Sequence, residues 1–327
     1  MTILMKNVVV YRTLQSKQLD FLQNNFNVSY FPDLENPLND KDFLEAMKTT
    51  DALFGAGLKV TKELLDQSPN LEVISNFSAG FDNLDLELLS ERKIIATNAP
   101  DALVDTVADL IFTLVLATSR RVVELDKFIR KGEWKENIGE SSFGTDVHHK
   151  TIGILGFGRI GKKVAQRALG FDMNILYHKR TRDKKAEETY HATYVENLDE
   201  LLAESDFVCV TLPLTKATKH IINYQKMELM KPDSIIVNGS RGAVINESDL
   251  IAALKNKVIG GAGLDVYEKE PIDRTNELIN LDNVVLTPHI GSATAETREM
   301  MVEQGIKNLT AALDGKKPDN LLNSDLF

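Results

Sequence analysis

Three glycines, Gly156, Gly158 and Gly161, stand between a short apolar run at 151–155 and an amphipathic run at 159–169. The spacing G-x-G-x-x-G in this context predicts a strand, a tight turn and a helix that begins at the turn. The first glycine would allow the turn, the second would let backbone N–H groups approach a pyrophosphate, and the third would allow close packing of helix on sheet. The segment therefore predicts a dinucleotide-binding α/β fold.

The next predicted strand, at 174–179, ends in cations. An NAD-binding fold usually places an acid there, about 20 residues after the glycine turn. This chain instead has Lys179, Arg180, Thr181 and Arg182. A carboxylate would repel a 2′-phosphate, whereas these cations would attract one through charge-assisted hydrogen bonds of roughly 1.5–3 kcal/mol each. The turn predicts NADP(H) as the preferred coenzyme, with NAD(H) as the alternative. The other interpretation is a solvated basic turn.

Short β-branched runs alternate with helical patterns along the chain, which is the rhythm of parallel sheets. The first hundred residues predict strands at 7–12, 52–57, 71–77 and 93–98, with helices at 40–48 and 61–68. A second series predicts six strands, at 151–156, 174–179, 207–213, 234–240, 261–266 and 284–290. Between the two series, 101–134 predicts one continuous, buried crossover helix, and a last helix is predicted at about 294–313.

These elements predict an α/β protein with two doubly wound parallel-sheet domains. We expect a flavodoxin-like substrate-binding domain made of residues 1–100 and 290–327. A coenzyme-binding Rossmann domain at 101–289 would be inserted between those segments. The active site would lie in the cleft between the domains, and the two chain crossings would act as a hinge.

Charge and composition exclude several classes of partner. The net charge of −10 argues against nonspecific binding to nucleic acid or to an anionic membrane, because both need a basic surface. The chain has one cysteine, Cys209, inside an apolar run, where a buried role is expected. It has no run of 18 apolar residues and no signal-peptide pattern, so we expect a cytoplasmic protein. Its histidines lack metal-ligand spacing, so no metal is expected.

Polar residues follow three of the predicted strands in the second series. Arg241 comes after 234–240, Asp265 and Glu270 come at and after the end of 261–266, and His289 comes at the end of 284–290. Strand ends of this kind line the ligand crevice of open α/β sheets. Arginine can bind a carboxylate, histidine can exchange a proton near neutral pH, and a carboxylate beside it favours the charged ring. These residues predict a catalytic triad, unless they are merely polar loop residues.

Several ordered motifs make the chain resemble the D-isomer-specific 2-hydroxyacid dehydrogenase family over nearly its whole length. They are GFGRIG, NGSRGAVINESDLIAAL, GAGLDVYEKEP and LTPHIGSATAETR, with ISNFSAGFDNLDL and ATNAPDALVDTVADL in the first half. The segments SRRVVELDKFIRKGEW and HKRTR are most similar to the glyoxylate/hydroxypyruvate reductase branch, especially to bacterial members that also reduce 2-ketogluconate. That branch generally prefers NADPH, and the resemblance also implies a homodimer joined through the coenzyme domains.

The resemblance implies a role for each matching residue. Arg241 would bind the substrate carboxylate, His289 would protonate the carbonyl oxygen during reduction, and Glu270 would hold and charge His289. Coenzyme contacts are implied for Gly156, Gly158, Arg159, Ile160, Gly161, Lys179, Arg180, Thr181, Leu212, Pro213, Thr218, Gly239, Ser240, Asp265, His289, Gly291 and Thr106. Substrate contacts are implied for Gly57, Ala79, Gly80, Arg241, His289 and Trp134. Trp134 would either enter the neighbouring subunit's active site or anchor a dimer interface.

Two other functions fit parts of the pattern. One is a dinucleotide-sensing corepressor with the same triad, which would carry additional interaction tails beyond a chain that stops at Phe327. The other is D-3-phosphoglycerate dehydrogenase, which is disfavoured by the basic turn and by the missing C-terminal regulatory region. Formate oxidation is disfavoured because a glutamine would be expected in place of Glu270.

Overall fold

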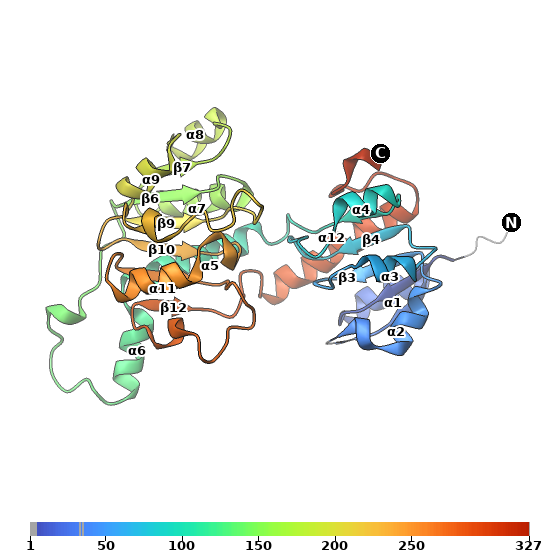
Figure 1. Ribbon diagram of the computed structural model, residues 1–327, viewed down its shortest axis with the longest axis horizontal. Helices are drawn as coiled ribbons and strands as arrows, with labels where there is room; N and C mark the ends of the chain where they lie inside the picture. The colour runs from blue at the N-terminus through green and yellow to red at the C-terminus, as the bar shows by residue number, and fades with distance from the viewer. Residues whose placement is uncertain (1–4, 33, 35, 327) are drawn as a thin grey trace. The chain divides into compact units, whose positions relative to one another are not determined.

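The computed structural model describes residues 5–32, 34 and 36–326 and divides the chain into two compact units (Figure 1). The first unit is Met1–Leu103 with Ala293–Phe327, and the second is Val104–Ser292. The second unit is therefore inserted between two segments of the first. Each unit is built on one parallel sheet, which confirms the predicted fold class. No helix in the described part of the chain is long and apolar enough to cross a membrane.

The first unit has a five-stranded sheet in the order β2-β1-β3-β4-β5, which is the flavodoxin-like order. Its strands are β1 (Asn7–Val10), β2 (Asn27–Tyr30), β3 (Ala52–Gly55), β4 (Val73–Asn76) and β5 (Ile95–Thr97). Its helices are α1 (Ser16–Asn25), α2 (Lys41–Met47), α3 (Lys62–Asp66), α4 (Leu86–Glu91) and α12 (Ala295–Leu313), with short 3-10 turns η1 (Pro37–Asn39) and η5 (Ser324–Leu326).

Both faces of this sheet are covered by helices. Alternate side chains of a strand point to opposite faces, and strand β1 follows this rule. Val8 and Val10 belong to the core that includes Ile306 of helix α12. Val9, between them, belongs to the core that includes Phe43 of helix α2. Continuous apolar runs are what a sheet buried on both faces requires.

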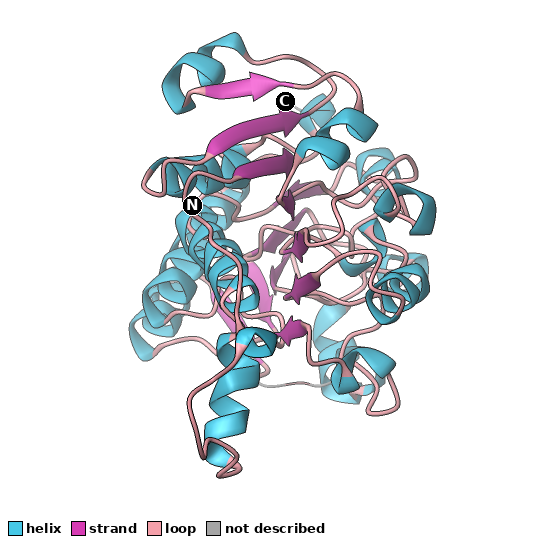
Figure 2. Ribbon diagram, turned by 90° about the vertical axis from the view of Figure 1, so that its left-hand side faces the viewer, coloured by secondary structure: helices cyan, strands magenta, loops and turns pink. Residues whose placement is uncertain are grey.

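The second unit has a seven-stranded parallel sheet in the order β12-β11-β10-β9-β6-β7-β8. Figure 2 shows strands in magenta with helices in cyan beside them. Its strands are β6 (Thr151–Leu155), β7 (Asn174–His178), β8 (Ala192–Tyr194), β9 (Phe207–Val210), β10 (Ile235–Asn238), β11 (Gly261–Leu264) and β12 (Val284–Leu286). Its helices are α5 (Val104–Ser119), α6 (Val122–Arg130), α7 (Arg159–Leu169), α8 (Lys184–Tyr190), α9 (Leu198–Glu204), α10 (Tyr224–Met227) and α11 (Glu247–Lys255), with 3-10 turns η2 (Glu140–Ser142), η3 (Gly242–Val244) and η4 (Glu277–Asn280).

The sheet of the second unit is doubly wound, with its switch point at β6. The chain runs from β6 to β7 on one side and later returns to pair β9 on the other side. In such sheets ligands bind at the carboxyl ends of the strands beside the switch point. The glycine turn follows the carboxyl end of β6, so the predicted coenzyme turn lies where the topology favours a ligand.

The predicted strand counts were wrong in both units because one strand was missed in each. The two missed strands are β2 and β8, and each lies at an edge of its sheet. Both are partly exposed, so neither carries the continuous apolar run of a central strand. The second sheet consequently has seven strands where six were predicted.

The single buried helix predicted at 101–134 was also wrong. Helix α5 ends at Ser119, and Arg121 has a left-handed φ of 53° before α6 begins. The carbonyl of Ser119 accepts a 2.8 Å hydrogen bond from the backbone N–H of Thr145, which ends the helical pattern there. Helix α5 is largely buried, whereas none of the residues of α6 is buried.

We call residues 122–143 the arm, and Figure 1 shows α6 and the loop after it extending away from the sheet of the second unit. The arm exposes large hydrophobic side chains at Val122, Val123, Ile129, Trp134, Ile138 and Phe143. Its base is tied down by Arg121, whose side chain binds Glu124 and the backbone carbonyls of Ser141 and Phe143.

Candidate active site

The glycine turn has the local geometry that its spacing predicts. Gly156 has a φ of 99°, which favours glycine, and its N–H donates to the carbonyl of His178 over 3.0 Å. A Cβ on Gly161 would lie 2.3 Å from the carbonyl oxygen of Gly156, so helix α7 can approach the turn only with glycine there. Gly158 caps α7 and has open space around its Cβ position. The backbone is therefore bare where a phosphate group would approach the positive end of a helix.

The segment that follows strand β9 packs against this turn. A Cβ on Gly156 would lie 2.9 Å from the backbone nitrogen of Leu212, which follows β9. Pro213 lies next to it, and its carbonyl accepts a 2.6 Å hydrogen bond from the hydroxyl of Thr218. Arg159 and Ile160 form the first turn of α7, while Thr106 lies in the first turn of α5.

In the basic turn after β7, some cationic side chains are paired with carboxylates and, within the described chain, one is not. Arg182 makes two 2.8 Å contacts with the carboxylate of Glu187. Hydrogen bonds from Arg182 and from the Tyr177 hydroxyl lower the pKa of Glu187 to about 2, so this carboxylate stays charged. Lys179 lies 3.8 Å from the carboxylate of Asp183. Among the described residues, the exposed side chain of Arg180 has no hydrogen-bond or ion-pair partner, and Thr181 beside it is also exposed.

Arg241 is held at the end of β10 by a small polar network. The carbonyl of Arg241 accepts from the side chain of Asn238, whose own oxygen accepts from the backbone and hydroxyl of Ser240. The guanidinium of Arg241 donates to the carbonyl of Ser240 over 2.8 Å. Gly239 packs closely against helix α5, because a Cβ there would meet Ile111 at 2.5 Å. Its small size therefore serves helix packing.

His289 and Glu270 form the most direct contact of the site. The distance between His289 Nδ1 and Glu270 Oε2 is 2.6 Å, and Glu270 Oε1 accepts a 3.0 Å hydrogen bond from the backbone of Tyr267. His289 itself has a left-handed φ of 53° and is exposed.

This pair shifts both pKa values toward the charged forms. The hydrogen bond to Glu270 raises the pKa of His289, and the partial burial of the half-exposed ring opposes that rise without cancelling it. Burial alone would raise the pKa of Glu270, but the hydrogen bonds from His289 and from the backbone of Tyr267 outweigh it and lower the pKa. The charge of Arg241 acts on both groups, so the three predicted side chains share one electrostatic environment.

Asp265 braces the segment that carries His289. Its carboxylate is almost fully buried and accepts hydrogen bonds from the hydroxyl of Thr287 and from the backbones of Ile290 and Gly291, at 2.7, 2.8 and 2.9 Å. A Cβ on Gly291 would lie 3.2 Å from this carboxylate, so the contact is close. Asp265 therefore supports the loop around His289, a contact that the strand-end pattern did not predict.

The predicted substrate residues of the first unit lie at the carboxyl edge of its own sheet. Gly57 follows β3 and has a φ of 81°. Ala79 and Gly80 follow β4, and their carbonyls accept hydrogen bonds from Asn98 and Ser78. Trp134 lies in the arm of the second unit, with 62% of its surface exposed.

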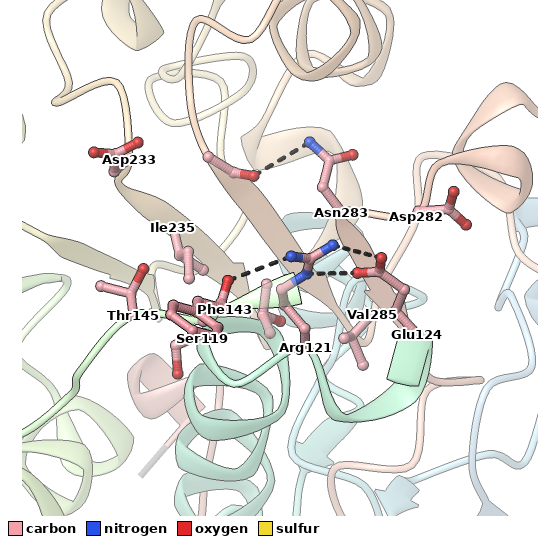
Figure 3. A pocket seen from close by; sticks show the side chains of 13 residues that line it. Ser119, Arg121, Glu124, Phe143, Thr145, Asp233, Ile235, Asp282, Asn283 and Val285 are labelled. Carbon is pink, nitrogen blue, oxygen red and sulfur yellow. Dashed lines mark hydrogen bonds and ion pairs between the residues drawn. The ribbon is translucent and has the colours of Figure 1, made fainter. Parts of the chain in front are cut away.

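A cavity lies at the amino ends of the strands of the second unit. It has a volume of about 300 Å³ and is lined by Arg121, Glu124, Phe143 and the residues that precede β10, β11 and β12, among them Asp233, Gly260 and Asn283 (Figure 3). Ligands of doubly wound sheets bind at the carboxyl ends of strands, so this amino-end cavity is not the candidate site. No group of three or more metal-ligating side chains gathers within the described residues.

The structure adds residues that the sequence did not single out. Tyr267 contacts Glu270 through its backbone and Thr287 through its hydroxyl. Glu187 engages Arg182, and Lys162 of α7 lies 2.7 Å from Asp183 in the basic turn. Tyr267 stands between Asp265 and Glu270 in the sequence, so its neighbourhood was visible, but its hydroxyl contact depends on the fold.

Fold and site together define a two-domain α/β protein with a dinucleotide turn and a histidine–glutamate pair at neighbouring strand ends. Residues 112–291 match the family model for the D-isomer specific 2-hydroxyacid dehydrogenase, NAD binding domain. The chain therefore belongs to the D-isomer specific 2-hydroxyacid dehydrogenase family, as its motifs predicted, and is an enzyme of that class.

Relatives and solved structures agree over almost the full length. A glyoxylate/hydroxypyruvate reductase B from Serratia proteamaculans is 44% identical over 322 residues, 98% of each chain. A crystal structure of a protein from Thermus thermophilus superposes with a TM-score of 0.89 at 38% identity, covering 97% of this chain and 99% of that one. The NADPH-dependent glyoxylate/hydroxypyruvate reductase from Sinorhizobium meliloti, in complex with NADP and malonate, has a TM-score of 0.86 at 29% identity, covering 99% and 98%.

Proposed function

We propose that this enzyme uses NADPH to reduce small 2-oxo acids, namely glyoxylate and hydroxypyruvate, to the D-2-hydroxy acids. We propose 2-ketogluconate as a further substrate. The 2.6 Å contact between His289 and Glu270 carries the proposal, because it supplies a charged imidazole beside an arginine at the ligand edge of the sheet. The relatives named as glyoxylate/hydroxypyruvate reductases support the substrate class.

The residues of the second unit fit a dinucleotide. The open space at Gly158 and the close approach of Gly161 form a cradle that a larger residue would fill. The backbone of this turn and the first turn of α7 would hold the pyrophosphate, and Arg180 would bind the 2′-phosphate. When bound, the nicotinamide supplies the hydride. The other proposed coenzyme contacts, from Leu212, Thr218 and Asp265, would come from the segments that follow β9 and β11.

Binding and proton transfer fall to this chain's side chains. Arg241 pairs with the substrate carboxylate and polarises the 2-oxo group. His289, protonated at Nε2 and held through Nδ1 by Glu270, donates its proton to the carbonyl oxygen as the carbon is reduced. Glu270 remains ionised and compensates the imidazolium charge. In the first unit, the backbone around Gly57, Ala79 and Gly80 would receive the substrate carboxylate.

A panel of 2-oxo acids assayed with NADPH and NADH tests this proposal. The panel contains glyoxylate, hydroxypyruvate, 2-ketogluconate and a phosphorylated 2-oxo acid, and kcat/KM is compared for each pair. We expect the first two acids to be reduced, with NADPH favoured over NADH by about tenfold or more. Absence of reduction with every acid would refute the proposed activity, and equal use of both coenzymes would refute the coenzyme preference alone.

Assembly and location are part of the same proposal. We infer a homodimer joined through the second units, supported by the exposed hydrophobic side chains of the arm. We also infer a cytoplasmic location, supported by the one cysteine of the sequence, Cys209, which is buried and without a disulfide partner.

A further inference from the structure

The hydroxyl of Tyr267 reaches the backbone carbonyl of Thr287, two residues before His289, over 2.9 Å. The same carbonyl accepts a 3.0 Å hydrogen bond from the backbone N–H of His289. A carbonyl oxygen has two lone pairs, so both donors can be accommodated. One carbonyl oxygen thus accepts from both the tyrosine hydroxyl and the backbone of His289, a residue with left-handed φ.

A second contact joins the same tyrosine to the partner of His289. The backbone N–H of Tyr267 donates to Glu270 Oε1 over 3.0 Å, while Glu270 Oε2 contacts His289 Nδ1 over 2.6 Å. The hydrogen bonds therefore form a closed ring, from Tyr267 N through Glu270 and His289 to Thr287 and back to the Tyr267 hydroxyl. Both ends of the Glu270–His289 contact are held by one residue.

We propose that Tyr267 is a positioning residue for proton donation. Its hydroxyl binds the backbone segment that carries His289, and its backbone N–H binds the carboxylate of Glu270, so one residue keeps His289 and Glu270 in contact. This inference rests on the proposed function, in which His289 is the acid. Tyr267 does not touch the reacting atoms, so its action passes through the Glu270–His289 contact.

The loop of Arg241 rests on the same residue. A Cβ on Gly242, the residue after Arg241, would lie 1.9 Å from the carbonyl carbon and 2.0 Å from the carbonyl oxygen of Tyr267. The backbone after Arg241 therefore packs directly on the Tyr267 peptide. Tyr267 thus contacts the carboxylate of Glu270 and the backbone segments that carry His289 and Arg241.

The hydroxyl and the ring of Tyr267 have separable roles. The side chain is 7% exposed and packs in the apolar core beneath β10 and β11, which phenylalanine would also fill. Burial and the nearby carboxylates of Asp265 and Glu270 raise the pKa of Tyr267 to about 12, so its hydroxyl keeps its proton over the whole working range. Replacement of Tyr267 by Phe therefore removes one hydroxyl donor, which lies 2.9 Å from the carbonyl oxygen of Thr287 and 3.3 Å from that of Leu264, and keeps the ring.

The test compares the full-length Tyr267→Phe variant with wild type and with Tyr224→Phe. Tyr224 lies in α10, and its hydroxyl accepts a 3.2 Å hydrogen bond from Asn256 away from the site, so it is a matched loss of one hydroxyl. Two quantities are measured, the pH profile of glyoxylate reduction with NADPH and the titration of the His289 ring by NMR. The His289 resonance is assigned by its loss in His289→Ala. Glu270, Asp265 and Arg241 are the charged groups that act on this ring.

We expect Tyr267→Phe to lower kcat about three- to tenfold, the effect of one lost hydrogen bond, with KM for NADPH unchanged. The pKa of His289 should fall, because a loosened ring contacts Glu270 less well, and the falling limb of the reduction profile should move to lower pH. In a Glu270→Gln background, Tyr267→Phe should add little further shift, since both act through the same contact.

Two outcomes separate this inference from the proposed function. If the His289 pKa and the pH limb of Tyr267→Phe equal those of wild type, the positioning role is wrong. If Tyr267→Phe lowers the His289 pKa but His289→Ala still reduces glyoxylate at the wild-type rate, the positioning stands and the assignment of His289 as the acid is wrong. A shift of equal size in Tyr224→Phe would also overturn the inference.

Discussion

At the scale of single residues, chemistry depends on which charges are paired. Glu270 is paired with His289, Glu187 with Arg182, and Arg180 with no described residue. The two pairs hold their members in place, whereas the free cation is available to a ligand. This difference decides which side chains should respond when a charge is removed.

The pH dependence of reduction follows from the Glu270–His289 pair. The folded pKa of His289 is raised from its ordinary value of 6.5, so the ring stays protonated to higher pH than a free imidazole and loses its proton as pH rises through the raised pKa. Reduction should therefore persist at neutral pH and fall at higher pH, while oxidation of the hydroxy acid should improve over the same range. In Glu270→Gln the charge is lost, so the falling limb should move to lower pH.

The control for this prediction is His289→Ala, which should lose roughly 100-fold or more of kcat, the usual contribution of a general acid. The loss in Glu270→Gln should be smaller, because the imidazole is still present. Rates of glyoxylate reduction between about pH 5 and 10 measure both. A Gln variant with the wild-type limb would show that Glu270 does not set the charge of His289.

At the residue scale, we expect Arg180 to set the preference for NADPH over NADH. Arg180→Ala should raise KM for NADPH about tenfold and leave KM for NADH nearly unchanged, because only NADPH carries the 2′-phosphate. Arg120→Ala is the matched control, since Arg120 is an exposed arginine at the end of α5, at the other edge of the sheet. Steady-state kinetics with both coenzymes measure the effect, and an equal rise for NADH and NADPH would contradict a phosphate contact.

At the scale of elements, two glycines of the turn between β6 and α7 have different roles: Gly158 would affect ligand binding and Gly161 would affect folding. A Cβ on Gly158 meets no heavy atom within 4 Å, whereas a Cβ on Gly161 would lie 2.3 Å from a backbone oxygen. Gly158→Ala should keep the stability of the protein but weaken NADPH binding, because its methyl group would stand in the pyrophosphate cradle. Gly161→Ala should destabilise the fold itself by about 1–3 kcal/mol, the usual cost of overpacking.

Two measurements distinguish these glycines. Urea unfolding without coenzyme reports the stability of each variant, and titration of NADPH fluorescence reports its dissociation constant. Each variant acts as the control for the other, since both add one methyl group to the same turn. If Gly158→Ala binds NADPH as tightly as wild type, this turn is not the pyrophosphate site.

At the scale of the whole molecule, the arm is the segment whose hydrophobic side chains are not covered by the rest of the described chain. Helix α6 has no buried residue, and six large hydrophobic side chains lie exposed between 122 and 143. Phe143 of the arm also lines the cavity at the amino ends of β10 to β12 (Figure 3). A soluble monomer rarely leaves such a surface uncovered, which favours a second copy as its cover.

Sedimentation equilibrium should therefore give the mass of a dimer for wild type. The Ile129→Glu variant should form a weaker dimer, which dissociates at protein concentrations where wild type stays dimeric. Ile129 is 54% exposed on α6, so the charge should act on the interface and not on the fold. Leu229→Glu, at another exposed hydrophobic position of the second unit, is the control and should keep the dimer mass. A monomer mass for wild type at every concentration would refute the assembly.

Trp134 distinguishes two versions of this assembly. If it enters the partner's active site, Trp134→Ala should raise KM for the 2-oxo acid while the dimer remains intact. If it only anchors the interface, the same variant should weaken the dimer and leave KM unchanged at concentrations where the dimer persists. Kinetics and sedimentation on one preparation decide between the two.

The sequence alone determined the features that depend on periodicity and short spacing. Central strands are buried on both faces and so appear as continuous apolar runs, and the glycine turn is specified within a few residues. These signals predicted two parallel sheets, the dinucleotide turn, and the strand-end positions of Arg241, Glu270 and His289. They could do so because each feature is encoded by residues that are neighbours in the chain.

Tertiary structure decided what depends on distant partners. The edge strands β2 and β8 form by pairing with β1 and β7, although their own side chains are only partly buried. Helix α5 ends at Ser119, where the carbonyl accepts a hydrogen bond from the backbone of Thr145, which is distant in sequence. The hydroxyl of Tyr267 meets Thr287 only when β11 and β12 lie side by side. Such contacts cannot be predicted from one segment, because hydrogen-bond partners far apart in sequence are brought together by the packing of the whole sheet.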